Sequence, residues 1–483
     1  MNRNAVPALV VVVALAGLVA FGGTDEPDVP TAEITANPAA DPTGTLSSSW
    51  FCPSAQGGPG NDLATAVDVA NVASTARTGT VTWRAAADGA ATTRSFTVAP
   101  GAVLRLRAVD AGPTPAASAL VETVGGGVVV EQAVSGARGA SIAPCASDAS
   151  PDWYLANGTT LSDATEVLSL FNPFPADAVV DMELATDQGR EAPGRLQGLV
   201  VPAGTTKFVQ ISEENVRRQE ITATAIRART GQLVVSRLQS FDGSLGRTGV
   251  SVGLAARAPA EVWSFAFGVN APGVTTRWHV FNPGEDEAEV SIEVMPYTGD
   301  TPEPIDVTVP ARSQVVVALP AEDAGVAPGV GFSSTVRSGN GVAVVAERSV
   351  DARAPYDRRG WSSSPGVTAS AGRWVLATGA AAASGEEWVV VFNPGAMARR
   401  FSVVALGAAG SNSLTRLQDV ALGPAAHVAF RLLDHVAAAD AAGPVGVGVS
   451  ADGPVVVERI VYGTGLVGLT AGSAVALAPD GPG

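Results

Sequence analysis

The stretch that decides the fold runs from Val389 to Leu406 and reads VVVFNPGAMARRFSVVAL. Two runs rich in Val and other apolar residues flank an Asn-Pro-Gly, which is the pattern of two strands joined by a tight turn. Nearly the same stretch occurs twice earlier, as WHVFNPGEDEAEVSIEVM from Trp278 and as LSLFNPFPADAVVDMELA from Leu168. A motif that occurs three times is either a copied working site or a copied structural device.

A longer unit surrounds each copy of this motif. Trp153, Trp263 and Trp374 each stand 19 residues before the Asn of the turn, and they are 110 and 111 residues apart. A strand headed by Pro follows the turn, and a strand with a polar pair, such as VVAERSV or VVVERIV, closes the pattern. A divergent fourth copy at the front begins at Trp50 and keeps Asn71, but it lacks the Phe and Pro of the turn.

The length of the unit indicates the fold class. About seven short strands in about 110 residues is the size of an immunoglobulin-like β-sandwich, and solenoid repeats are much shorter. We therefore predict an all-β chain of four tandem immunoglobulin-like β-sandwich repeats. We interpret the turn motif as a hairpin corner, in which Pro presets the second position, Gly accepts a positive φ as in a type II turn, and the Asn side chain caps the turn. The predicted repeats cover residues 49–150, 151–260, 261–371 and 372–483.

The N-terminus is of a different kind. Residues 5–21 are almost all apolar, Arg3 precedes them, and acidic residues follow. This order of charges places the bulk of the chain outside a membrane, and the run is intermediate in length between a signal-peptide core and a full span. We expect a signal anchor or signal peptide over residues 1–23, with an uncleaved anchor favoured, and a disordered spacer over residues 24–48.

Composition and motifs narrow the possible functions. The net charge is -16, and no Lys/Arg cluster is interleaved with aromatics, so nucleic-acid binding is not expected. The sequence has no G-x-S-x-G, P-loop or H-E-x-x-H, and no Cys or His at zinc spacing, so we expect no enzyme activity, no cofactor and no metal. The counterparts of His279 in other copies are Ser169 and Val390, which indicates a tolerant, outward strand position.

The recurrent polar pairs Glu347-Arg348 and Glu458-Arg459 resemble an acid with its partner. Neighbours in a strand point to opposite faces, so they do not pair directly with each other. We interpret them as devices for cross-strand pairing or edge protection.

The two cysteines of the chain, Cys52 and Cys145, both lie in the first copy. Cys52 is in the opening strand and Cys145 in the closing strand, and such strands are often neighbours in a sandwich. Exported proteins meet oxidising conditions. We predict a Cys52–Cys145 disulfide, which would stabilise the first repeat by about 4–5 kcal/mol in the chain-entropy model.

A ligand site is expected in a segment that the copies do not share. The best candidate is APYDRRGWSSSPG, which joins aromatic rings to cations near a repeat boundary, where grooves tend to form. The alternative is a loop folded onto its own domain. The candidate contact residues are Tyr356, Arg358, Arg359 and Trp361.

Several segments together resemble a known family. These are SSSWFCP, IAPCAS with DWYLANG, LSLFNPFPADAVVDMELATDQGR and the stretch from ERSV through FNPGAMARRFSVVAL to GPAAHVAFRL. With the N-terminal apolar run, they are similar to an actinobacterial secreted or membrane-anchored family catalogued as domain of unknown function 5719. The resemblance implies a cell-envelope location and β architecture, and it supplies no site residues.

These patterns lead to one expected function with one alternative. We expect a non-enzymatic, exported cell-envelope protein, anchored in the membrane with its domains outside, or secreted if the signal is cleaved. It would act as a structural or adhesive scaffold, and its partner would be a cell-wall glycan or another envelope protein. The alternative is a glycan-binding protein that assists the assembly or anchoring of wall polysaccharide.

Overall fold

The computed structural model describes residues 36–53, 63–85, 90–111, 116–214, 216–319, 325–379, 386–436, 443–463 and 468–479. Residues 35–483 form one compact unit, and its fold is nearly all-β, as predicted. The expected anchor over residues 1–23 and the beginning of the expected spacer lie outside the described residues. Among the residues that are described, no helix has the length and apolar character needed to cross a membrane.

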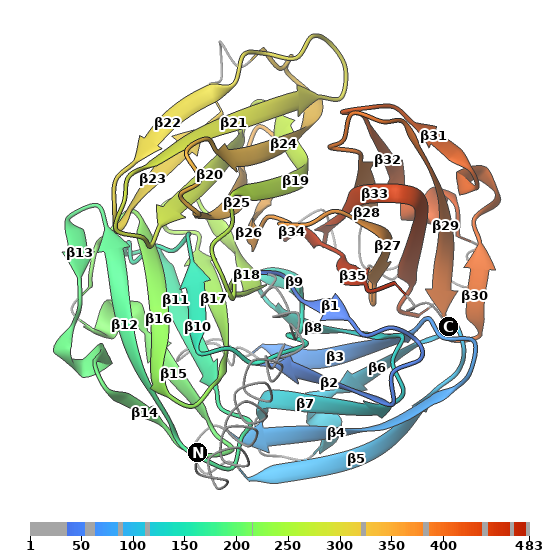
Figure 1. The fold of residues 1–483 in the computed structure, drawn as a ribbon, viewed down its shortest axis with the longest axis horizontal. Helices are drawn as coiled ribbons and strands as arrows, with labels where there is room; N and C mark the ends of the chain where they lie inside the picture. The colour runs from blue at the N-terminus through green and yellow to red at the C-terminus, as the bar shows by residue number, and fades with distance from the viewer. Residues whose placement is uncertain are drawn as a thin grey trace, which may run out of the picture. The chain divides into compact units, whose positions relative to one another are not determined.

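The strands form four consecutive sheet pairs along the chain (Figure 1). Each pair has two sheets. The Trp sheet contains the recurrent Trp in its first strand, and the hub sheet ends with one of four strands that contact one another in a cycle, here called the hub strands. In the first pair the Trp sheet is β2 (Ser47–Cys52), β7 (Ala116–Val124), β4 (Arg77–Ala85) and β5 (Ala91–Val98), and the hub sheet is β6 (Val103–Arg107), β3 (Ala64–Asn71), β8 (Val128–Gly136) and β9 (Gly139–Pro144).

The second and third sheet pairs repeat this order. In the second, the Trp sheet is β10 (Asp152–Leu155), β16 (Thr222–Thr230), β12 (Ala178–Thr186), β13 (Gly189–Glu191) and β14 (Leu199–Val201), and the hub sheet is β15 (Thr206–Gln210), β11 (Ala164–Phe171), β17 (Val234–Asp242) and β18 (Thr248–Leu254). In the third, the Trp sheet is β19 (Val262–Asn270), β24 (Val330–Ser338), β21 (Ala288–Pro296) and β22 (Ile305–Val309), and the hub sheet is β23 (Ser313–Ala318), β20 (Val274–Asn282), β25 (Val345–Ala352) and β26 (Gly360–Pro365).

In the fourth sheet pair one long strand, β33 (Gly446–Tyr462), serves both sheets. The Trp sheet adds β27 (Ala371–Leu376), β29 (Arg399–Gly407), β30 (Gly410–Ser413), β31 (Val420–Leu422), β35 (Val475–Leu477) and β1 (Ala39–Ala40). The hub sheet adds β32 (His427–Arg431), β28 (Glu386–Phe392) and β34 (Leu469–Ser473). Five 3₁₀ helices lie between strands: η1 (Ala108–Ala111), η2 (Gly194–Leu196), η3 (Ile211–Glu214), η4 (Thr415–Leu417) and η5 (Leu432–Asp434).

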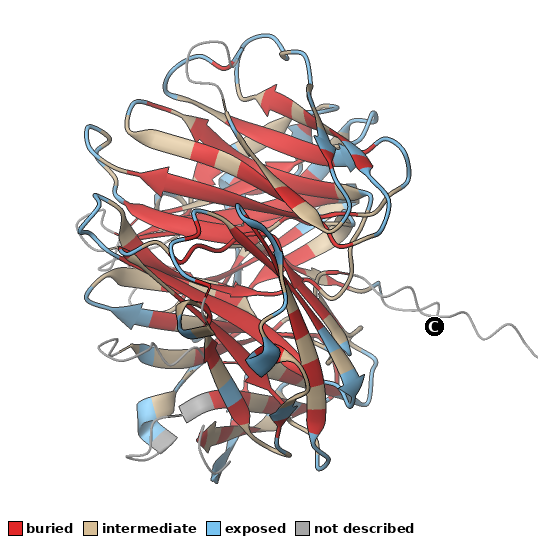
Figure 2. Cartoon of the chain, turned by 90° about the vertical axis from the view of Figure 1, so that its left-hand side faces the viewer, coloured by how far each residue is buried: buried red, intermediate tan, exposed pale blue. Residues whose placement is uncertain are grey.

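Three of the recurrent tryptophans, Trp153, Trp263 and Trp374, join the two sheets of their pair by a hydrogen bond. Trp153, Trp263 and Trp374 are fully or almost fully buried, which confirms the prediction that they belong to the core. The indole N–H of Trp153 donates to the carbonyl of Leu233, and that of Trp263 to the carbonyl of Val344. Both carbonyls lie at the start of a hub-sheet strand, so apolar burial and a hydrogen bond act at one point. Figure 2 shows that burial runs along the strands and exposure concentrates in the loops.

The Asn-Pro corners are structural, as predicted, but their turn type is not type II. The Asn282 side chain donates to the carbonyls of Asp286 and Val309 and accepts the N–H of Gly284 at 3.0 Å. Gly284 does not have a positive φ, so the cap comes from the Asn side chain and not from a left-handed Gly. Asn71 makes the same kind of bonds without a following Pro, which explains how the first copy can dispense with Pro.

The two ends of the described chain meet. Strand β1 pairs in parallel with β35, with Ala39 opposite Ala476, and the hub strands contact one another in the cyclic order β9, β18, β26, β34 (Figure 1). The contacts therefore pass from each sheet pair to the next and return from the fourth to the first. This corrects the prediction of a disordered spacer for residues 36–48: the small side chains of Ala36 and Ala40 are buried against other sheet pairs.

Candidate functional site

The predicted ligand-contact residues do not share one set of neighbours: Arg358 contacts residues of the fourth sheet pair, whereas Trp361 packs against the second. Arg358 donates to Glu386 at 2.8 Å, and its guanidinium lies 5.3 Å from the ring centre of Tyr462. Burial and the neighbouring Tyr356 raise the pKa of the Tyr462 hydroxyl. Arg359 is exposed. Tyr356, Arg358 and Arg359 as ligand contacts stay a prediction.

Trp361 is not the exposed aromatic residue that the sequence suggested. It lies in hub strand β26, only 5% of its surface is exposed, and its ring meets Phe241 edge to face at 4.9 Å. The Arg247 guanidinium covers the Phe241 ring at 4.3 Å. The segment WSSSP looked like a polar loop because its serines are polar, but these serines are buried between hub strands.

The recurrent Glu-Arg strands carry buried ion pairs between sheet pairs. The three ion pairs are Arg237–Glu347, Arg348–Glu458 and Arg459–Glu131. In each, the Arg belongs to one sheet pair and the Glu to the next, and the last ion pair joins the fourth sheet pair to the first. All six side chains are essentially inaccessible to water. This corrects the interpretation as cross-strand pairs within a sheet or edge protection.

Backbone groups of the Trp sheet complete each ion pair. The N–H of Ala156 donates to Glu347, and the N–H of Phe267 donates to Glu458, both at 2.8 Å. Arg348 in turn donates to the Phe267 carbonyl. A buried charge is tolerated only when it is paired and hydrogen-bonded, and these junctions meet both conditions. Burial raises the pKa of Glu131, and the charge of Arg459 partly offsets that effect.

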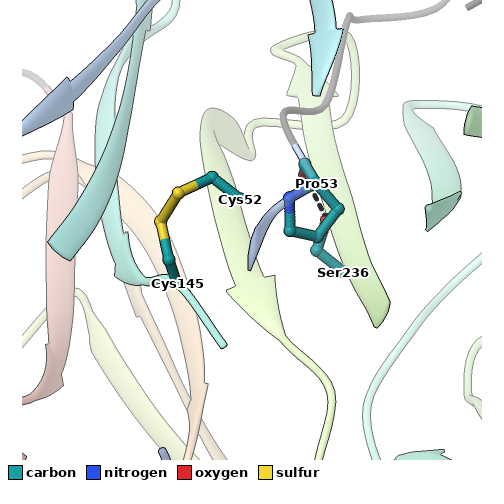
Figure 3. Close-up of a disulfide and its surroundings, with 4 residues drawn as sticks. All are labelled: Cys52, Pro53, Cys145 and Ser236. Atoms are coloured by element: carbon teal, nitrogen blue, oxygen red, sulfur yellow. Dashed lines mark hydrogen bonds between the residues drawn. A yellow bond between two sulfur atoms is a disulfide. The ribbon is translucent and has the colours of Figure 1, made fainter. Parts of the chain in front are cut away.

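The junction between the first and second sheet pairs has different chemistry (Figure 3). Gln132 stands where the other copies have Arg, Ser236 stands where they have Glu, and Pro53, which has no N–H, stands near the place of Ala156. The Ser236 hydroxyl donates to the Pro53 carbonyl at 2.7 Å. The Gln132 side chain is fully buried, and neither of its amide atoms has a hydrogen-bond partner within the described ranges.

The predicted disulfide between Cys52 and Cys145 is confirmed. Both cysteines are completely buried. Figure 3 places the bridge beside Pro53 and Ser236, at the junction that lacks an ion pair. The bridge links the last residue of β2 to the residue that follows β9, so it closes the first sheet pair on itself.

The hub strands are joined by side-chain hydroxyls. Ser251 donates to the Ser363 carbonyl at 3.2 Å, and Ser362 donates to the Ala471 carbonyl at 3.3 Å. Equivalent bonds complete the cycle: Val252 N–H donates to the Ser141 hydroxyl, and the Thr470 hydroxyl donates to the Ala140 carbonyl. The cavity between the strands measures about 30 Å³, which is room for about one water molecule.

Two buried titratable groups were missed or misread from the sequence. His279 was expected to face outward, but it is buried and lies 2.8 Å from the Ser349 hydroxyl. Burial, with Arg277 and Arg237 nearby, lowers the pKa of His279 to about 3. Burial raises the pKa of Glu166 to about 7, although Thr222 donates to it at 2.9 Å. No group of three His, Cys, Asp or Glu side chains within the described residues could hold a metal ion.

Fold and site together define an all-β protein whose sheet pairs are fastened to one another by buried polar side chains. The chain belongs to a family of unknown function, DUF5719, whose model matches residues 115–260 and 238–465. No curated protein matches the chain.

Three solved structures are similar to parts of the chain. They are the Anabaena sensory rhodopsin transducer (24% identity, TM-score 0.17, 19% of this chain and 88% of that one), Thermotoga maritima 1070 (17%, 0.20, 22% and 93%), and a tetra-tandem repeat from the extending region of a large adhesion protein (11%, 0.11, 84% and 93%). TM-scores this low carry no argument about fold or function.

Proposed function

We propose that the chain is a non-enzymatic scaffold of the cell envelope, built from four immunoglobulin-like sandwiches closed into a ring. Each sheet pair would be one sandwich, and an N-terminal anchor or signal over residues 1–23 would export the ring. The observation that supports a scaffold is the unbroken cycle of buried polar contacts between sheet pairs. A protein that only needed to space two ends apart would not require contacts from its last unit back to its first.

Chemistry at the junctions supports rigidity over adaptability. Each Arg-Glu ion pair is inaccessible to water and is also hydrogen-bonded to backbone groups. Displacement of one sheet pair by an ångström would therefore leave a buried charge without its partner. Hydroxyl bonds between hub strands impose the same restriction near the centre of the cycle. A ring of this kind could present its exposed loops in fixed relative positions to a glycan or to another envelope protein.

The burial of Trp361 weakens the glycan-binding alternative. It relied on an exposed aromatic beside cations, and the Trp361 side chain is buried against Phe241. The exposed side chain of Arg359 remains available to an acidic wall polymer.

Fractionation of source cells tests the location. We expect the chain in the envelope fraction, and we expect protease added to intact cells to digest it. Recovery in the cytosol, protected from external protease, would contradict the proposal. Binding of the chain to isolated cell walls tests the adhesive role. Comparison with an R359A variant that keeps its thermal stability shows whether the Arg359 side chain contributes to this binding.

A further inference from the structure

Among the described residues, the junction between the first and second sheet pairs has no buried Arg-Glu ion pair, although Arg138 donates across it to the Ser240 hydroxyl at 3.4 Å. Thr206 donates to the Ser118 hydroxyl at 2.8 Å, and Ser236 donates to Pro53. The Val252 N–H also donates across the junction to the Ser141 hydroxyl, and the Phe51 and Phe174 rings meet at 6.3 Å. A small apolar cluster lies between the hub strands. The cluster consists of Val134, Ala143, Leu238, Val250 and Val252, with Leu63 against it.

Closure of this junction leaves a whole side-chain amide without partners, whereas single atoms such as Arg237 Nε, Arg348 Nε and Glu458 Oε1 lack a partner at ion-pair junctions within the described residues. The buried Gln132 amide has no hydrogen-bond partner in the described parts of the chain, so closing the junction removes it from water without compensation. Opening would let water reach the amide. At the other three junctions, opening would instead separate a buried ion pair from its backbone partners.

The junction between the fourth and first sheet pairs is reinforced, and residues 41–46 connect β1 of the fourth pair to β2 of the first. Arg105 holds Asp68 at 2.8 Å and also donates to Thr378 of the fourth pair. The pairing of β1 with β35 adds a second fastening there. The first and second pairs are joined by the short chain segment between β9 and β10, which can act as a hinge.

We infer that the closed cycle opens at the junction between the first and second sheet pairs before it opens anywhere else. Opening exposes the apolar cluster around Leu238, while the Cys52–Cys145 disulfide keeps the first sheet pair itself closed. The disulfide therefore separates opening of the junction from unfolding of the sheet pair.

Amide hydrogen exchange on the full native chain tests this inference directly. The Val252 N–H donates across the weak junction to Ser141, and the Ala471 N–H donates across a junction with an ion pair to Ser362. Both amides can exchange only when their own junction opens. We expect the Val252 amide to exchange about tenfold faster than that of Ala471, or more. Equal exchange, or faster exchange at Ala471, overturns the inference.

Thiol labelling gives a second, independent readout. Leu238 and Ile460 occupy equivalent positions and both are buried. In the full chain with its disulfide intact, L238C should react with a thiol reagent about tenfold faster than I460C. Adding Q132R, S236E and P53A to L238C should slow its labelling, because these changes restore the charged partners and the backbone N–H. Labelling of L238C at the rate of I460C contradicts the inference, and a variant that fails to fold leaves the amide measurement decisive.

Discussion

Removing one partner of a buried ion pair should destabilise the whole cycle. We consider Glu458→Gln, because the amide oxygen of the new side chain can still accept the Phe267 N–H, which now donates to Glu458 at 2.8 Å. The substitution therefore removes the charge and leaves the shape almost unchanged. Arg348, which lies 2.7 Å from Glu458 and is almost fully buried, would remain charged without its counter-ion.

The expected magnitude follows from burial. Breaking a buried ion pair by removing one partner typically destabilises a protein by about 3–5 kcal/mol. The cation–π contacts of Arg348 with the Phe265 and Phe267 rings, at 5.4 and 5.6 Å, offset only part of this loss. We expect Glu458→Gln to lower the free energy of unfolding by about 3 kcal/mol.

A double substitution tests whether the ion pair is the cause. Arg348→Gln with Glu458→Ser copies the natural residues of the first junction, Gln132 and Ser236. Since neither charge then remains buried alone, the double variant should lose about 2–3 kcal/mol less than the sum of its two single variants.

Urea titration followed by tryptophan fluorescence and by circular dichroism measures these changes, and coincident transitions justify a two-state analysis. The exposed pair Arg400–Asp419 supplies the control, because Asp419→Asn should leave the midpoint unchanged. An unchanged midpoint for Glu458→Gln, or additive losses in the double variant, would refute the reasoning.

Three further predictions concern other buried positions. Since burial raises the folded-state pKa of Glu166 from 4.5 to about 7, the free energy of unfolding should fall as pH rises through this range. Glu166→Gln should remove this pH dependence and stabilise the protein by about 3 kcal/mol at pH 8. Thermal unfolding measured against pH tests this, with the exposed Glu220→Gln as the control. Gly360→Ala should destabilise, because φ is +148° and a Cβ would lie 2.5 Å from the Leu469 backbone nitrogen, whereas Gly189→Ala has nothing within 4 Å; denaturant midpoints should rank Gly360→Ala as the worse. Leu155→Cys with Ala255→Cys should form a disulfide in oxidising buffer, detected by mass as the loss of two hydrogens; free thiols in the folded variant would contradict this.

Sequence periodicity was sufficient for the elements and the core. Spacing alone placed Trp153, Trp263 and Trp374 in equivalent buried positions, and turn chemistry identified Asn282 as a capping side chain. Such features depend on residues close in sequence or on one repeated pattern, so one copy reports on the others. The disulfide was equally accessible, because only two cysteines exist to be paired.

The contacts between sheet pairs could not be predicted in the same way. Glu347 and Arg348 alternate along a strand, and alternation normally means one buried and one exposed face. Here both faces of the hub sheet are covered, one by its own Trp sheet and the other by a neighbouring sheet pair, so both residues are buried. The same coverage explains why His279 is not outward and why Trp361 is not exposed. A periodic pattern identifies faces, but it does not identify what covers them.

The first copy looks degraded in the sequence, but its differences compensate one another in the structure. In each copy, one N–H group donates to the carbonyl of the residue just before the recurrent polar pair, so the four donors are equivalent: Cys145, Ala255, Gly366 and Ala474. The residues two after each recurrent Trp are Cys52, Leu155, Phe265 and Leu376.

In three copies, therefore, a large side chain meets a small one at this place: Leu155 meets Ala255, Phe265 meets Gly366, and Leu376 meets Ala474. A Cβ on Gly366 would lie 2.8 Å from the Phe265 ring, which explains the need for Gly opposite Phe. Cys52 and Cys145 fill the same space with two medium-sized side chains and a covalent bond. The first copy thus has a disulfide inside its own sheet pair in place of apolar packing, and it has no ion pair to the second sheet pair. The first sheet pair is stabilised internally, at the same place where its attachment to the second is weakened.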